Sequence, residues 1–117
     1  MRQGSDMFRK VKSQDVDLDG ITIMGEVTAA PAAVVRLFGP PSPGDGYKIS
    51  GEYAFVNDGG EAFVLHDWMY TNLCSEDGPT PEEFWAIKEP LELSISSLDL
   101  DTAEFAKWVQ QQLAPAT

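Results

Sequence analysis

The strongest constraint on the fold is a pair of apolar, aromatic-rich segments in the middle of the chain, joined by a short polar turn. Residues 47–56 and 61–70 contain most of the aromatic side chains of this region, and Asn57-Asp58-Gly59-Gly60 separates them. Asn, Asp and Gly favour the tight turns that join antiparallel strands. The pattern predicts a central β-hairpin with strands over residues 47–56 and 61–70.

The register of this hairpin decides which side chains enter the core. Pairing Val56 with Glu61 predicts one aromatic core face, made of Tyr47, Ile49, Tyr53, Phe55, Ala62, Val64, Trp68 and Tyr70. The reverse face then mixes the charged residues Lys48, Glu52 and Asp67 with the apolar residues Ala54, Val56, Phe63, Leu65 and Met69. We expect a helix or a partner to cover part of that reverse face.

A second informative segment, Asp15 to Glu26, has two interpretations. Its sequence, DVDLDGITIMGE, matches an EF-hand calcium loop, in which the ligands would be the carboxylates of Asp15, Asp17, Asp19 and Glu26 and the carbonyl of Ile21. Calcium is the only cofactor that the sequence suggests. The match is weakened by Ile23 at a position that is usually polar and by the lack of a second EF-hand.

The same residues also fit a β-hairpin turning at Asp19-Gly20. Leu18 would then face Ile21 and Val16 would face Ile23, so that four apolar side chains share one face. This alternation needs no metal and explains the isoleucine at the ninth loop position. The hairpin is the favoured interpretation, and the calcium loop over residues 15–26 is the alternative.

Capping patterns predict the remaining elements. Thr28 to Gly39 reads as a short helix capped by Thr28, and Thr80 with Glu83 forms a capping box for a second. Residues 91–96 alternate as a strand, and a capping box at Asp101 and Glu104 opens a C-terminal amphipathic helix. The predicted fold is α+β: an antiparallel sheet of about five strands, from two hairpins plus one strand, with two or three short helices packed on it.

Charge and length set the domain organisation and the class of partner. The 117 residues carry a net charge of −11. Residues 1–12 hold four basic residues and one acidic residue, which gives +3 and leaves −14 for the rest. We therefore expect a flexible basic arm over residues 1–12 and a single acidic domain over 13–117. An acidic body repels phosphates, so we expect no direct nucleic acid binding, and a basic protein surface is the favoured partner.

The cysteine and histidine content and the lack of long apolar segments bear on the cellular location of the protein. Cys74 is the single cysteine and His66 the single histidine, which excludes an internal disulfide and the usual zinc ligand sets. The chain has no apolar run long enough to span a membrane and no signal-peptide core. A reducing, cytoplasmic location is expected.

Few residues suggest chemistry. His66 and Asp67 are neighbours on one predicted strand, so their side chains point to opposite faces and cannot pair directly. A small-molecule or enzymatic pocket around His66, Tyr53 and Trp68 is a further alternative. No nucleotide-binding loop or nucleophile elbow is present, and the sequence assigns no catalytic residue.

One pattern spreads over about half of the chain: Phe38-Gly39, Pro41, Gly44 to Lys48, Glu52-Tyr53, Asp58-Gly59 and Asp67-Trp68. In these residues the chain resembles small uncharacterised proteins of phage and of some bacterial, including cyanobacterial, genomes. The resemblance is carried by turn and core residues and brings no activity. Met69 stands where such proteins often have Lys.

Together these features predict a small, non-enzymatic binding protein whose acidic body engages a basic partner. The resemblance implies an accessory or host-interaction role. The calcium module and the His66 pocket stay open as alternatives, and a homodimer through an edge strand or the reverse face is also open.

Overall fold

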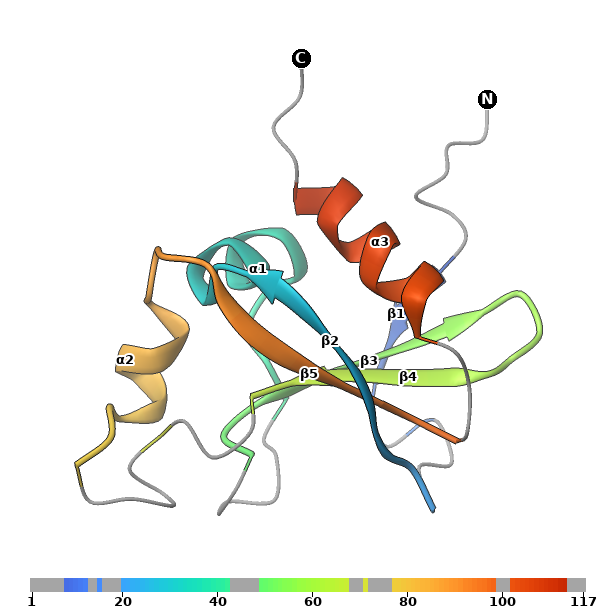
Figure 1. Ribbon diagram of the computed structural model, residues 1–117, viewed down its shortest axis with the longest axis horizontal. Helices are drawn as coiled ribbons and strands as arrows, with labels where there is room; N and C mark the ends of the chain where they lie inside the picture. The colour runs from blue at the N-terminus through green and yellow to red at the C-terminus, as the bar shows by residue number, and fades with distance from the viewer. Residues whose placement is uncertain are drawn as a thin grey trace.

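The computed structural model describes residues 8–12, 15, 20–42, 49–67, 71, 77–98 and 102–113. Its centre is a five-stranded antiparallel sheet in the order β1-β3-β4-β5-β2 (Figure 1). The strands are β1 (Phe8–Val11), β2 (Thr22–Ala29), β3 (Glu52–Asn57), β4 (Ala62–His66) and β5 (Leu91–Ser97), and the helices are α1 (Pro31–Phe38), α2 (Pro81–Trp85) and α3 (Ala103–Leu113). The α+β architecture predicted from the sequence is confirmed.

The three helices and one face of the sheet share a core that is dominated by aromatic rings. Phe55 on β3 contacts Phe105 and Trp108 of α3, with ring centroids 5.2 and 5.6 Å apart. Phe8 and Phe38 pack against the same ring of Trp108. This cluster ties both α1 and α3 to the sheet, because each ring contributes a large apolar area and edge-to-face contacts.

The turn between β3 and β4 is tighter than the sequence suggested. The Asn57 N–H donates to the Glu61 carbonyl (3.1 Å), and the Asn57 side-chain oxygen accepts from the N–H groups of Gly59 and Glu61 (3.0 and 2.9 Å). Gly60 has φ 79°, a left-handed conformation that Gly adopts readily. The loop therefore has three residues, Asp58 to Gly60, and Val56 lies opposite Ala62.

The predicted pairing of Val56 with Glu61 is thus wrong by one residue, and a one-residue shift moves every side chain of a strand to the other face. Phe63 and Leu65 lie on the core face opposite Phe55 and Tyr53, whereas Val64 and His66 lie on the reverse face. Several side chains of the reverse face are also buried, namely Ala54, Val56, Val64, His66, Ser94 and Ser96. The central strands are therefore enclosed on both faces.

The N-terminal third differs from expectation in two places. Phe8–Val11 were assigned to the flexible arm, but they form β1, and Phe8 is only 6% exposed. Thr28 was assigned as a helix cap, but it pairs with Glu92 in the sheet, and Ala30 precedes the helix with no side-chain cap. The described pairing of β2 is with β5; residues 16–19, which would complete the predicted first hairpin, lie outside the described residues.

The other two helices lie where the sequence predicted them. Thr80 and Glu83 form the predicted capping box at the start of α2. The predicted apolar face of α3 is buried at Phe105, Trp108 and Val109. Asp101, the predicted cap of α3, lies outside the described residues.

The turn makes a direct prediction for Gly60 and its neighbour. Gly60→Ala should lower the free energy of unfolding by about 1–2 kcal/mol, because a β-carbon disfavours the left-handed conformation. Gly59→Ala is the matched control, since Gly59 has no positive φ and a β-carbon there meets only ordinary contacts. Urea unfolding measures both variants. Equal losses in the two variants would contradict this description of the turn.

Candidate functional site

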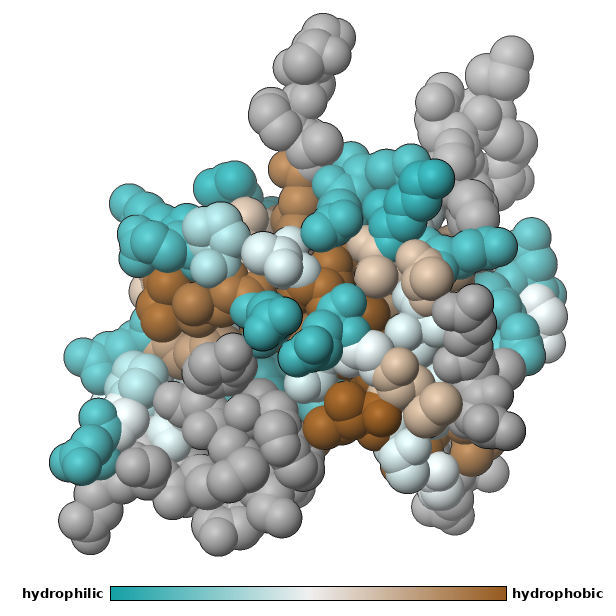
Figure 2. All heavy atoms as spheres, in the orientation of Figure 1, coloured by the Kyte–Doolittle hydropathy of each residue, from teal (hydrophilic) through white to brown (hydrophobic). Residues whose placement is uncertain are grey.

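A hollow of about 370 Å³ opens between α1, α2 and the segment that leads into β3. It is lined mainly by rigid apolar side chains, and the full set is Val35, Pro40, Pro41, Ser50, Pro81, Glu82, Trp85 and Ala86. We call it the proline–tryptophan hollow. Figure 2 shows that apolar residues also gather between α1 and α2 and over β2, within a largely hydrophilic face. Glu82 is the charged residue in the lining.

A buried carboxylate holds the floor of the hollow in place. Asp67, which is fully buried, follows the last residue of β4. One of its oxygens accepts from the N–H groups of Ser50 and Gly51 (2.8 and 3.2 Å), and the other accepts from the Ser50 hydroxyl (2.9 Å). Three donors replace the water that this carboxylate would otherwise bind.

Ser50 connects this hydrogen-bond network to Trp85. The Trp85 indole N–H donates to the Ser50 hydroxyl oxygen (3.0 Å), and the indole ring packs edge-on against Tyr53. Gly51 allows this close packing, because a β-carbon there would lie 2.8 Å from Pro41 and 3.0 Å from the Trp85 indole nitrogen. Hydrogen bonds and close packing therefore hold Ser50, Gly51 and Trp85 together beneath the hollow.

The predicted pocket around His66, Tyr53 and Trp68 is not formed by the residues that the structure describes. Tyr53 faces the core opposite Leu65, whereas His66 pairs with Glu52 on the reverse face, and Trp68 lies outside the described residues. The Tyr53 hydroxyl donates to the Gly39 carbonyl (2.6 Å), and burial raises the pKa of Tyr53. The phenol is therefore a neutral structural donor.

His66 instead bridges two strands. Its Nδ1 donates to the Asp67 carbonyl (2.6 Å), and its Nε2 lies 2.8 Å from the Ser96 hydroxyl oxygen, from which a neutral imidazole accepts. A hydroxyl beside an imidazole whose other nitrogen is held by an acceptor is also the arrangement of a catalytic nucleophile and its general base. However, His66 and Ser96 are 1% and 6% exposed, so a substrate cannot reach the hydroxyl in this conformation. The contact ties β4 to β5.

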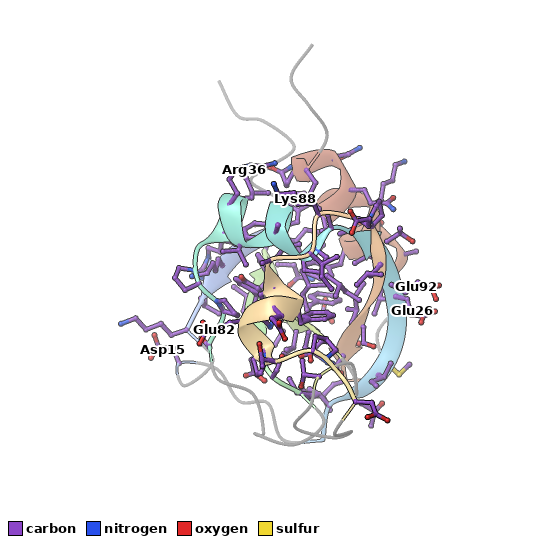
Figure 3. The ribbon with its side chains drawn as sticks, turned by 90° about the vertical axis from the view of Figure 1, so that its left-hand side faces the viewer. Asp15, Glu26, Arg36, Glu82, Lys88 and Glu92 are labelled. Carbon is purple, nitrogen blue, oxygen red and sulfur yellow. The ribbon has the colours of Figure 1, made fainter. Side chains whose placement is uncertain are left out.

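Two of the predicted calcium ligands, Asp15 and Glu26, are not brought together. Asp15 lines a hollow beside β1, and Glu26 lies on β2, at the other edge of the sheet. Four inter-strand spacings correspond to roughly 19 Å, and Figure 3 shows the two carboxylates on opposite sides of the molecule. Ile21 precedes β2, and Asp17 and Asp19 lie outside the described residues. No group of three or more potential metal ligands occurs among the described side chains.

Sequence reasoning missed Ser50, Asp67 and Trp85 as a unit. The usable signal was the hairpin itself: Ser50 and Gly51 precede β3, and Asp67 follows β4, so the correct register places these strand ends side by side. The contribution of Trp85 could not be found in this way, because α2 is distant in sequence and its docking depends on tertiary packing.

No protein-family model and no curated protein matches the sequence of this chain. In the described part of the chain, the helices are too short or too polar to cross a membrane.

The network below the hollow can be tested by removing one hydroxyl. Ser50→Ala should cost about 1–3 kcal/mol in urea unfolding, because it leaves the Trp85 indole N–H and one Asp67 oxygen without their partner. Ser42→Ala is the control, since Ser42 bonds to Glu52 through its backbone, and it should change stability by less than about 0.5 kcal/mol. A similar loss in both variants would argue against the network.

The separation of Asp15 and Glu26 predicts that calcium does not stabilise this fold specifically. Thermal unfolding in EDTA, in millimolar calcium and in millimolar magnesium should give the same midpoint, because a ligand that binds the native state would raise it. A calcium-specific rise that Asp15→Ala removes would overturn this conclusion.

Proposed function

We propose that this protein is a binding protein that recognises a basic segment of a partner protein. An apolar side chain of the partner enters the proline–tryptophan hollow, and a flanking Lys or Arg pairs with Glu82. The observation that carries the proposal is a preformed apolar hollow whose charged lining residue is an acid. Rigid walls favour binding because little conformational entropy is lost on association.

The charge around α2 supports a basic partner. Residues 77–89 contain four exposed acidic side chains, Asp77, Glu82, Glu83 and Glu89, and one exposed basic one, Lys88. In Figure 3, Glu82 projects from α2 below α1. The same charge disfavours nucleic acid, as the composition predicted.

Simple energetics limit what the hollow can do alone. Burial of one aliphatic side chain contributes about 1.5–3 kcal/mol, and an exposed ion pair about 0.2–1 kcal/mol. Even at the upper end of these ranges, their sum of about 4 kcal/mol corresponds to a dissociation constant of only about 1 mM. We therefore infer that the partner also contacts the surrounding acidic surface, which would speed association by long-range attraction.

The proposal includes a cytoplasmic location and, on the strength of the resemblance to phage and bacterial proteins, an accessory role directed at a host protein. The single cysteine, which cannot form an internal disulfide, supports a reducing compartment. The resemblance spans Phe38-Gly39, Pro41, Gly44 to Lys48, Glu52-Tyr53, Asp58-Gly59 and Asp67-Trp68. Of these residues, Pro41 lines the hollow and Asp67 supports it from below.

A defined peptide can test the hollow. The probe is a fluorescent peptide with a central leucine flanked by lysines, and its affinity is measured by anisotropy. Glu82→Lys should weaken binding about five- to tenfold, because an attraction becomes a repulsion. Ala86→Phe, which fills the hollow and leaves the charge unchanged, should weaken it more than about tenfold.

Glu26→Lys is the matched control, because it makes the same change in net charge on the other side of the molecule (Figure 3). It should reduce affinity by less than about twofold, since charges beyond the Debye length are screened. The proposal fails if Ala86→Phe binds as the wild type does, or if the Glu26 and Glu82 variants weaken binding equally.

A further inference from the structure

A second hollow, of about 550 Å³, lies beside β1. Its charged lining is mainly basic, whereas that of the proline–tryptophan hollow is acidic. Its lining consists of Arg9, Lys10, Val11, Lys12, Asp15 and Val56. Successive strand residues project to alternating faces. Arg9, Val11 and Val56 share the reverse face, so the hollow lies over that face of the sheet at β1, the strand whose outer side is an edge of the sheet.

The hydrogen-bond pattern identifies which backbone groups face this edge. Asn57 bonds to Glu61 across the β3–β4 turn, so the alternate residues Ala54 and Val56 direct their backbone groups away from β4 and toward β1. Their partners on β1 are Val11 and Arg9. The N–H and C=O of Lys10, which lies between them, consequently point outward.

No strand in the described part of the chain pairs with this outer edge, since β1 is terminal in the sheet order. The Lys12 carbonyl is already used, because it accepts from the Asp15 N–H (2.9 Å). The backbone of Lys10 thus offers one donor and one acceptor to an added strand.

Three cations lie along this strand. Arg9, Lys10 and Lys12 form no ion pair within the described residues, although Asp15 lines the same hollow. Arg9 lies on the same face of the sheet as Val56, its partner on β3. Lys10 lies on the other face, which it shares with its partner Phe55. An added strand would therefore meet positive charge on both of its faces.

We propose that β1 binds an extended acidic segment of another protein as a sixth, antiparallel or parallel, strand of the sheet. Backbone bonds to Lys10 supply the pairing, carboxylates meet the three cations, and an apolar residue covers Val11 and Val56. A small anion would use the cations alone and leave the edge unpaired. A second copy of this chain is disfavoured, because two bodies of −11 repel each other.

The first test uses charge. The probe is a labelled peptide in which Glu alternates with Thr and Val, and a version with Lys in place of Glu is the negative probe. Arg9→Glu should weaken binding of the Glu peptide about tenfold, because an attraction becomes a repulsion at one partly screened site. Arg36→Glu, which makes the same change at an exposed position on α1, should change affinity by less than about twofold. Equal effects of the two variants would overturn the proposal.

The second test isolates the backbone. Lys10→Gln removes the charge and keeps the N–H, whereas Lys10→Pro removes both, and proline is tolerated at an edge position whose N–H faces outward. Thermal unfolding checks that both variants fold. Lys10→Pro should bind at least about tenfold more weakly than Lys10→Gln, since it cannot donate to the added strand.

Amide hydrogen exchange gives a readout that does not depend on any variant. The Lys10 amide should exchange rapidly in the free protein and become protected when the Glu peptide is bound. Peptide binding without this protection would show that only side-chain charges are involved and would overturn strand addition. Protection that increases with protein concentration in the absence of peptide would assign the edge to self-association instead.

Discussion

The register of the β3–β4 hairpin determines what every other part of the molecule contacts. Asn57 and Gly60 close a three-residue loop, and this loop places Phe55 opposite Phe63 on the face that receives α3. The stacked rings of Phe63 and Phe105 lie 5.2 Å apart in the resulting core. A shift of one residue would replace Phe63 and Leu65 on this face with Val64 and His66, which could not fill the same volume.

The same register brings the open ends of the two hairpin strands together and so forms the floor of the proline–tryptophan hollow. With Glu52 opposite His66, the backbone before β3 reaches the carboxylate after β4. A buried carboxylate is costly unless donors surround it, and Asp67 receives three from Ser50 and Gly51. The indole of Trp85 joins this network through one hydroxyl. The surface hollow therefore depends on the hydrogen bonds that the buried Asp67 carboxylate requires, and is not an independent feature of the loops.

Local signals predicted local structure well. The capping box of α2 and the apolar stripe of α3 depend on residues within a few positions of each other, and both were found from the sequence. The partner of β2 could not be predicted, because its pairing with β5 joins segments about 70 residues apart. β1 was missed for a different reason. Its exposed Arg9 and Lys10 resemble a solvated tail, and charged side chains are also how proteins protect edge strands from unwanted pairing.

The two hollows carry opposite charge, and the distance over which charge acts decides how they can coexist. Glu82 lines one and three cations line the other. At physiological ionic strength the Debye length is about 8 Å. Ligands at contact therefore respond to the nearest side chains, and the net charge of −11 governs mainly the approach of distant partners. A basic partner is attracted at both ranges, whereas an acidic strand must overcome long-range repulsion before it reaches Arg9 and Lys10. Backbone pairing at Lys10 supplies the short-range interaction that makes such binding selective for extended segments over free anions.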